Sequence, residues 1–111
     1  MFGVAVLGFA REYNCIVVLK DYITHIASPS GELYVNNTGN SGLARGGSGD
    51  VLAGIIASFA AQGYPAYDAA VCGVYLHGLA ADRCAARISQ YGMLPSDILF
   101  DLCGIFHEND R

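Results

Sequence analysis

Residues 38–52 are the part of this sequence whose residue types could carry out chemistry. Five glycines lie between residues 39 and 50, Asp50 follows the last of them, and an apolar helical pattern begins directly afterwards. Glycines let backbone N–H groups turn toward a common point, because no Cβ blocks positive φ or close approach. A helix that starts there adds unpaired N–H groups and the positive end of its dipole, which together favour an anion such as phosphate. A carboxylate repels phosphate, so we interpret Asp50 as an acid or base acting on whatever meets the phosphate.

Helices and strands alternate around this glycine-rich run. A continuous apolar, largely β-branched run is typical of a strand covered on both faces, as in a parallel sheet, and Ser-Pro-Ser-Gly is turn chemistry that predicts a hairpin. The expected class is therefore α/β with a mixed sheet. In chain order we expect a helix over 2–13, a strand over 16–19, a hairpin of strands 23–27 and 32–35, a helix from Val51 to Gly63, a helix over 67–88, and a short final helix from Pro95.

Composition restricts the classes of function. The chain has 111 residues, enough for one domain, and is 53% hydrophobic with 14% charged residues. Since typical soluble domains are about 25% charged, we expect apolar surface to be buried against further copies of the chain or a missing part of a larger protein. A net charge of −4 argues against nucleic acid. No membrane span or export signal is evident, so a cytoplasmic protein with four reduced cysteines is expected.

The glycine-rich run closely resembles the signature of the NAD(P)H-hydrate dehydratases. Residues 73–78 with Ala81 and Asp82 match the helix that follows in that family, and residues 17–20 with Thr24 match its nucleotide-binding strand and turn. The resemblance implies that residues 1–111 form the C-terminal part of a ribokinase-like domain, with a hairpin, an anion loop and packed helices, and that the N-terminal half is missing. The residues that match in the signature are Asn36, Thr38, Gly39, Asn40, Gly42, Ala44, Gly46, Gly47, Ser48, Gly49, Asp50, Val51 and Leu52.

The same resemblance implies an activity and a set of site residues. Members of the family use ADP or ATP to dehydrate hydrated NADH and NADPH, and Mg²⁺ is expected with the nucleotide, although no carboxylate cluster here identifies its ligands. By resemblance Asp50 is the catalytic base and contacts the hydrated nicotinamide ring, and Asn40 is a second substrate-binding candidate. The expected nucleotide-binding residues are Lys20, Asp21, Tyr22, Ile23, Thr24, Gly46, Gly47, Ser48 and Gly49.

Other interpretations of these residues stay open. Asp50 could merely cap its helix, Lys20 could be an ordinary solvated lysine, and His77, with no ligand-type neighbour at helical spacing, is expected to be a hydrogen-bonded core histidine. A ribokinase-like small-molecule kinase would share the Gly-x-Gly-Asp ending of the loop, and an inactive remnant or a self-associating module would share the apolar surface. Three residues depart from the family pattern: Asp21, Ser41 and Arg45.

Overall fold

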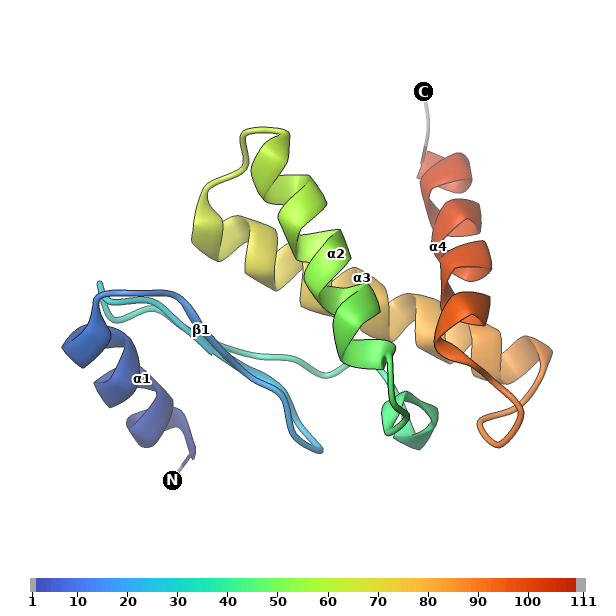
Figure 1. Cartoon of the computed structure of the whole chain (residues 1–111), viewed down its shortest axis with the longest axis horizontal. Helices are drawn as coiled ribbons and strands as arrows, with labels where there is room; N and C mark the ends of the chain where they lie inside the picture. The colour runs from blue at the N-terminus through green and yellow to red at the C-terminus, as the bar shows by residue number, and fades with distance from the viewer. Residues whose placement is uncertain (1, 110–111) are drawn as a thin grey trace.

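The computed structural model describes residues 2–109 (Figure 1). The helix and strand order follows the prediction, with the sheet and α1 at one end of the molecule and α4 at the other. In chain order the elements are α1 (Phe2–Tyr13), β1 (Val17–Leu19), β2 (His25–Ala27), β3 (Leu33–Val35), the single 3₁₀ turn η1 (Ser41–Leu43), α2 (Ser48–Ala61), α3 (Ala66–Arg87) and α4 (Pro95–Asn109).

The three strands form one sheet in the order β1-β2-β3, in which Val18 pairs with Ile26 and Ile26 pairs with Tyr34. The predicted hairpin between β2 and β3 is present, and its turn closes through Gly31, whose φ of 101° is a conformation that favours glycine. Both pairings are antiparallel. The α/β class is confirmed, but the parallel pairing that a mixed sheet requires does not occur within residues 2–109.

Helices cover both faces of the sheet. Successive side chains of a strand point to opposite faces, and apolar residues of β1 and β2 occur on both. On one face α1 contributes Val6 and Ala10, which pack with Ala27. On the other face Ile26 packs against Leu52 of α2, and against Ala70 and Val74 of α3. The strand at 16–19 was expected to be covered on both faces, and β1 is indeed half-buried between these two layers.

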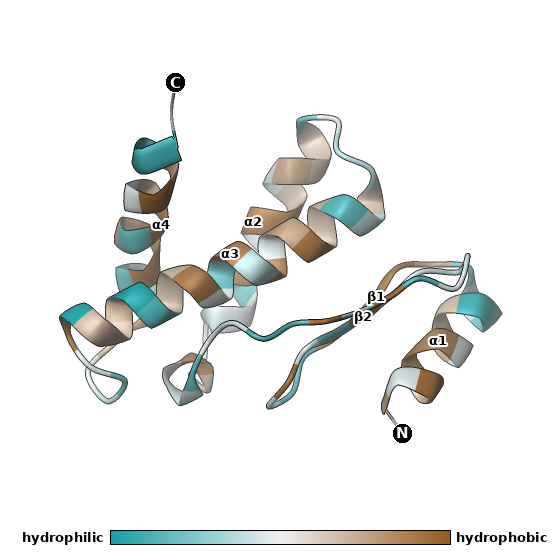
Figure 2. Cartoon of the chain, turned by 180° about the vertical axis from the view of Figure 1, so that it is seen from behind, coloured by the Kyte–Doolittle hydropathy of each residue, from teal (hydrophilic) through white to brown (hydrophobic). Residues whose placement is uncertain are grey.

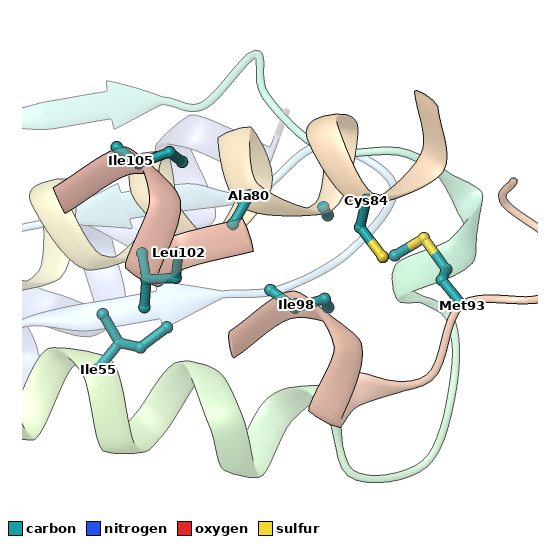
Figure 3. Packing of buried hydrophobic residues seen from close by; sticks show 8 residues of the cluster. Ile55, Ala80, Cys84, Met93, Ile98, Leu102 and Ile105 are labelled. Atoms are coloured by element: carbon teal, nitrogen blue, oxygen red, sulfur yellow. The ribbon is translucent and has the colours of Figure 1, made fainter. Parts of the chain in front are cut away.

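A second core joins the three C-terminal helices (Figure 3). Side chains from α2, α3 and α4 converge there with Met93, which precedes α4. The last helix is longer than predicted, since Ile105 extends the buried stripe of Ile98 and Leu102 by another turn. The buried members of this cluster are Ile55, Ala80, Ala81, Cys84, Met93, Ile98, Leu102 and Ile105.

Hydrophobic side chains also remain on the surface. Figure 2 shows hydrophobic ribbon along α1, at the end of the molecule away from α4. On this helix Val4 is 78% exposed, and Phe2 and Phe9 are each more than half exposed. Among residues 2–109, no helix is both long enough and apolar enough to cross a bilayer.

Candidate functional site

The glycine-rich loop ends where α2 begins, at Ser48 rather than at the predicted Val51. Gly47 is the N-cap residue with φ 97° and ψ −19°, a left-handed conformation that turns the chain into the helix early. Its lack of a side chain leaves the start of α2 without a side-chain cap. Asp50 therefore lies inside the first turn, and the positive end of the helix dipole remains available to an anion.

Lys20 follows β1 and reaches this helix start. Its Nζ donates a hydrogen bond of 2.9 Å to Oγ of buried Ser48, and that hydroxyl in turn donates to the carbonyl of Leu43 at 2.6 Å. A Cβ built on Gly49 would lie 3.8 Å from the same Nζ. An ammonium beside the positive end of a helix is repelled by it, and a bound anion would remove that repulsion. The structure thus brings Lys20 close to Ser48 and Gly49. All three are predicted nucleotide-binding residues, and that role stays a prediction.

The other residues of the predicted nucleotide segment form the turn from β1 to β2. The carboxylate of Asp21 accepts the N–H of Tyr22 at 2.8 Å, so it is bonded within its own turn. Tyr22 is 96% exposed and Ile23 is 45% exposed. The carbonyl of Thr24 accepts the N–H of Asn36 at 2.9 Å, which extends the hairpin pairing by one bond. Apart from Lys20, this segment therefore presents mainly backbone and exposed side chains.

Asp50 lies at a groove between α2 and α4. The groove has a volume of about 400 Å³, and Leu99, Leu102 and Phe106 supply much of its α4 wall. Gly54, one turn after Asp50, also lines it, and a Cβ there would meet nothing within 4 Å. The exposed Asp50 carboxylate thus has an apolar surface on one side and the start of α2 on the other.

The first half of the glycine-rich loop lies along one face of α3. Thr38 Oγ1 donates to the carbonyl of Tyr75 at 2.9 Å, and Gly39 N–H donates to Oδ2 of Asp82 at 3.0 Å. Gly78 lies between these two contacts in sequence, where its missing Cβ gives Thr38 room. Asp82 was recognised in the sequence as part of the family helix, but no role was predicted for it. Its partner Gly39 is 43 positions away, so no local pattern marks the contact.

Both ends of the Asn40 amide are hydrogen-bonded, one to α3 and one within the loop. Its Nδ2 donates to Oδ1 of Asp82 at 3.0 Å, and its Oδ1 accepts the N–H of Gly42 at 2.9 Å. The sequence suggested a substrate contact for Asn40, which stays a prediction. The geometry adds a role that was not predicted, in shaping the loop.

Two of the residues that depart from the family pattern tie the loop to the connection between α3 and α4. Ser41 Oγ donates to Oε1 of Gln90 at 2.6 Å, and the guanidinium of Arg45 donates to the carbonyl of Tyr91. Arg45 is thus directed to a neighbouring turn, and both side chains stay exposed. These contacts are a structural reason for a polar residue at position 41 and a long cation at position 45.

His77 on α3 is buried, as expected of a core histidine, but one of its ring nitrogens has no partner among the described residues. Its side chain is 2% exposed, and Nε2 has no hydrogen-bond partner among the described residues. Burial lowers its pKa from 6.5 to about 4, and the positive charge of Lys20 acts in the same direction. The imidazole is therefore neutral at pH 7. The core position was expected, and the absence of a protein partner for Nε2 among residues 2–109 was not.

The described residues offer no protein cage for a metal ion, since no three His, Cys, Asp or Glu side chains gather within residues 2–109. Mg²⁺ commonly binds through substrate phosphates, waters and one or two carboxylates. The four cysteines are free thiols.

Comparison with known proteins decides the family. The sequence profile of NAD(P)H-hydrate dehydratase matches residues 5–102. This chain belongs to the NAD(P)H-hydrate dehydratase family. Within that family the chain is 57% identical over 78 residues to an ADP-dependent (S)-NAD(P)H-hydrate dehydratase of Neisseria meningitidis, covering 70% of this chain and 26% of that protein. It is 48% identical over 91 residues to a bifunctional NAD(P)H-hydrate repair enzyme of Moorella thermoacetica, covering 82% of this chain and 17% of that protein.

Two solved structures share the fold of this chain. The ADP/ATP-dependent NAD(P)H-hydrate dehydratase of Bacillus subtilis, co-crystallised with ATP and Mg²⁺, superposes with a TM-score of 0.91 at 30% identity. The match covers 96% of this chain and 39% of the Bacillus chain. A ribokinase-like protein of Enterococcus faecalis gives a TM-score of 0.81 at 37% identity. The chain thus has the ribokinase-like architecture of the family and spans well under half the length of these relatives.

Proposed function

We propose that this chain carries the phosphate site and the catalytic base of an ADP- or ATP-dependent NAD(P)H-hydrate dehydratase, and that residues 1–111 form part of a ribokinase-like domain. The observation that supports this most directly is the position of Lys20 Nζ, bonded to Ser48 at the uncapped start of α2. Asp50 lies in the first turn of the same helix. A cation and helix N–H groups therefore lie at the start of α2, and the first turn of that helix also carries a carboxylate. A relative of this chain is an ADP-dependent (S)-NAD(P)H-hydrate dehydratase.

The geometry suggests how each group would act. Lys20 and the N–H groups at the start of α2 would hold the terminal phosphate of ADP or ATP and stabilise charge on the transferred phosphoryl group. Asp50 would take the proton of the ring hydroxyl as the hydroxyl oxygen attacks the terminal phosphorus. The bridging P–O bond breaks at the same time, and its electron pair leaves with AMP or ADP. The carbon–oxygen bond then breaks, inorganic phosphate leaves with the electron pair, and loss of a ring proton restores the double bond. Mg²⁺ would be held mainly by the nucleotide phosphates and by waters, because no three metal-ligating side chains gather within residues 2–109.

Asp50→Asn tests the catalytic assignment. The amide keeps the size of the side chain and removes the base, so nucleotide-dependent dehydration of hydrated NADH should fall by about 10²-fold or more. Released inorganic phosphate and restored NADH absorbance would be measured together. Retention of full activity in a folded Asp50→Asn protein would contradict the proposal, and a stable phosphorylated product would point to a small-molecule kinase instead.

Lys20→Met tests the phosphate site independently of catalysis. Charge-assisted hydrogen bonds are about twice as strong as neutral ones, so binding of inorganic pyrophosphate should weaken by about tenfold in calorimetry. Arg83→Met is the matched control, because it also removes one positive charge but from an exposed pair with Glu108 on α3 and α4. Equal affinities of the two variants would show that Lys20 does not contact the anion.

The exposed apolar residues support a further part of the proposal. Phe2, Val4 and Phe9 of α1 and Phe100 of α4 leave large apolar side chains in water. We propose that these faces pack against further protein, either another copy of the chain or more of a dehydratase domain. A cytoplasmic location, compatible with four free thiols, is part of the same proposal.

A further inference from the structure

We propose that Asp82 and Asn40 are positioning residues whose mutual hydrogen bond sets the glycine-rich loop, and through it the anion site at the start of α2. This inference rests on the proposed function, because it assigns how the phosphate site of that function is held in place. This positioning role requires no contact between either side chain and the anion, and it is separate from the substrate contact predicted for Asn40. We refer to the two side chains together as the Asp82–Asn40 pair.

The pair has one satisfactory arrangement of its polar atoms. Gly42 N–H must find an acceptor, and Asn40 Oδ1 supplies it at 2.9 Å. That orientation directs Asn40 Nδ2 toward Asp82, whose Oδ1 accepts it at 3.0 Å. The second carboxylate oxygen accepts Gly39 N–H at 3.0 Å. Both oxygens of Asp82 accept, so an amide at position 82 would place a donor against a donor.

The pair is connected to the proposed phosphate site through the backbone of η1 and two further hydrogen bonds. Gly42 belongs to η1, whose last residue, Leu43, accepts Ser48 Oγ through its carbonyl at 2.6 Å. The same Oγ accepts Lys20 Nζ at 2.9 Å. Asp82 is therefore linked to Lys20 through the loop and the first residue of α2.

Packing restricts the loop on its other side. A Cβ on Gly42 would lie 2.6 Å from the sulfur of Met93, which is itself 1% exposed. The loop thus passes between a buried methionine and the α3 face that carries Asp82, with little room to shift without loss of contacts. Because small displacements of a binding group reduce its effect strongly, losing the pair should weaken anion binding although neither residue contacts the anion.

An exchange of the two side chains provides the test. Asp82→Asn leaves two amides facing each other, and Asn40→Asp leaves two carboxylates facing each other. The double variant restores every bond. Its amide at position 82 can accept Gly39 N–H and donate to the carboxylate at position 40, which in turn accepts Gly42 N–H. The exchange also keeps the volume and the net charge of the parent.

We expect each single variant to bind inorganic pyrophosphate at least about tenfold more weakly than the parent, in line with the loss of a hydrogen bond to a charged group. The double variant should return to within about threefold of the parent in the same calorimetric assay. Asp68→Asn, an exposed change of the same charge on α3, is the matched control and should leave affinity unchanged. Should a single variant fail to fold, folding of the double variant is itself the rescue.

Amide resonances of Gly39 and Gly42 give a readout without ligand. In each single variant the like groups at positions 40 and 82 repel each other and displace the loop, so at least one of the two resonances should shift. Both should return to their parent positions in the double variant. Recovery of these resonances without recovery of pyrophosphate affinity would overturn the inference, because one of the two side chains would then act on the anion directly. Absence of pyrophosphate binding by the parent would reject the proposed phosphate site. The two resonances would then still decide whether the pair holds the loop.

Discussion

Replacing Gly78 with alanine is expected to destabilise the folded chain by about 3 kcal/mol, at the upper end of the usual cost of overpacking. The new Cβ would lie 2.1 Å from Oγ1 of Thr38 and 2.7 Å from its backbone carbonyl carbon. A side-chain rotation could relieve the first contact but not the second, so the loop itself must move away from α3. The higher helix propensity of alanine, about 1 kcal/mol, is too small to offset this.

Urea unfolding of Gly78→Ala beside Gly104→Ala would check this result. Gly104 lies inside α4 and a Cβ there meets nothing within 4 Å, so its replacement should be neutral or stabilise by up to about 1 kcal/mol. Equal unfolding free energies for the two variants would show that Thr38 does not press against α3. Weaker pyrophosphate binding should accompany the stability loss, because the displaced loop leads into α2.

Acid should weaken the folded state through His77. The pKa of this imidazole is about 4 in the folded chain, against an ordinary value of 6.5. Between these pH values the unfolded chain takes up a proton that the folded chain refuses, so stability falls as pH falls from 6.5 toward 4. At 1.36 kcal/mol per pKa unit the full loss is about 3 kcal/mol, and above pH 6.5 the effect is absent.

His77→Leu separates this effect from other acid-sensitive groups. Leucine is apolar and similar in size, and it removes a buried nitrogen that has no partner among the described residues, so folding should survive at neutral pH. Unfolding free energies of parent and variant, measured from pH 7 to pH 4, should diverge in favour of the variant. A His77 ring resonance that titrates near pH 6.5 in the folded parent would contradict the assignment.

Sequence patterns predicted the elements here because their signals are local. The turn at 28–31 and the apolar run of β1 can each be recognised from a few consecutive residues. The helices can be recognised from apolar spacing over a few turns. The start of α2 was misplaced by three residues, since the signal is the left-handed backbone of Gly47 rather than the first apolar side chain. The antiparallel pairing of β1 with β2 was also missed, because the residue pattern of a strand does not indicate which other strand it will pair with.

In the candidate site, too, features with a local sequence signal were predicted and features that depend on distant residues were not. Lys20 and the glycine-rich run could be found from residue types, and the structure brings them together. The bond from Gly39 to Asp82 could not be found, because 43 residues separate the partners and nothing local marks an aspartate as an acceptor. The unsatisfied nitrogen of His77 is likewise a property of packing, visible only when every neighbour is placed.

The single long helix α3 has a consequence for how the chain unfolds. Its 22 residues span about 33 Å at the rise of an α-helix, in a molecule 41 Å long. Ala70 and Val74 belong to the core under the sheet, and Ala80 and Cys84 belong to the core shared with α4. If either core unfolded, α3 would lose the packing partners that it has there, and the other core would be weakened. Both cores should therefore open as one cooperative unit, with the slowest amide exchange in the middle of α3.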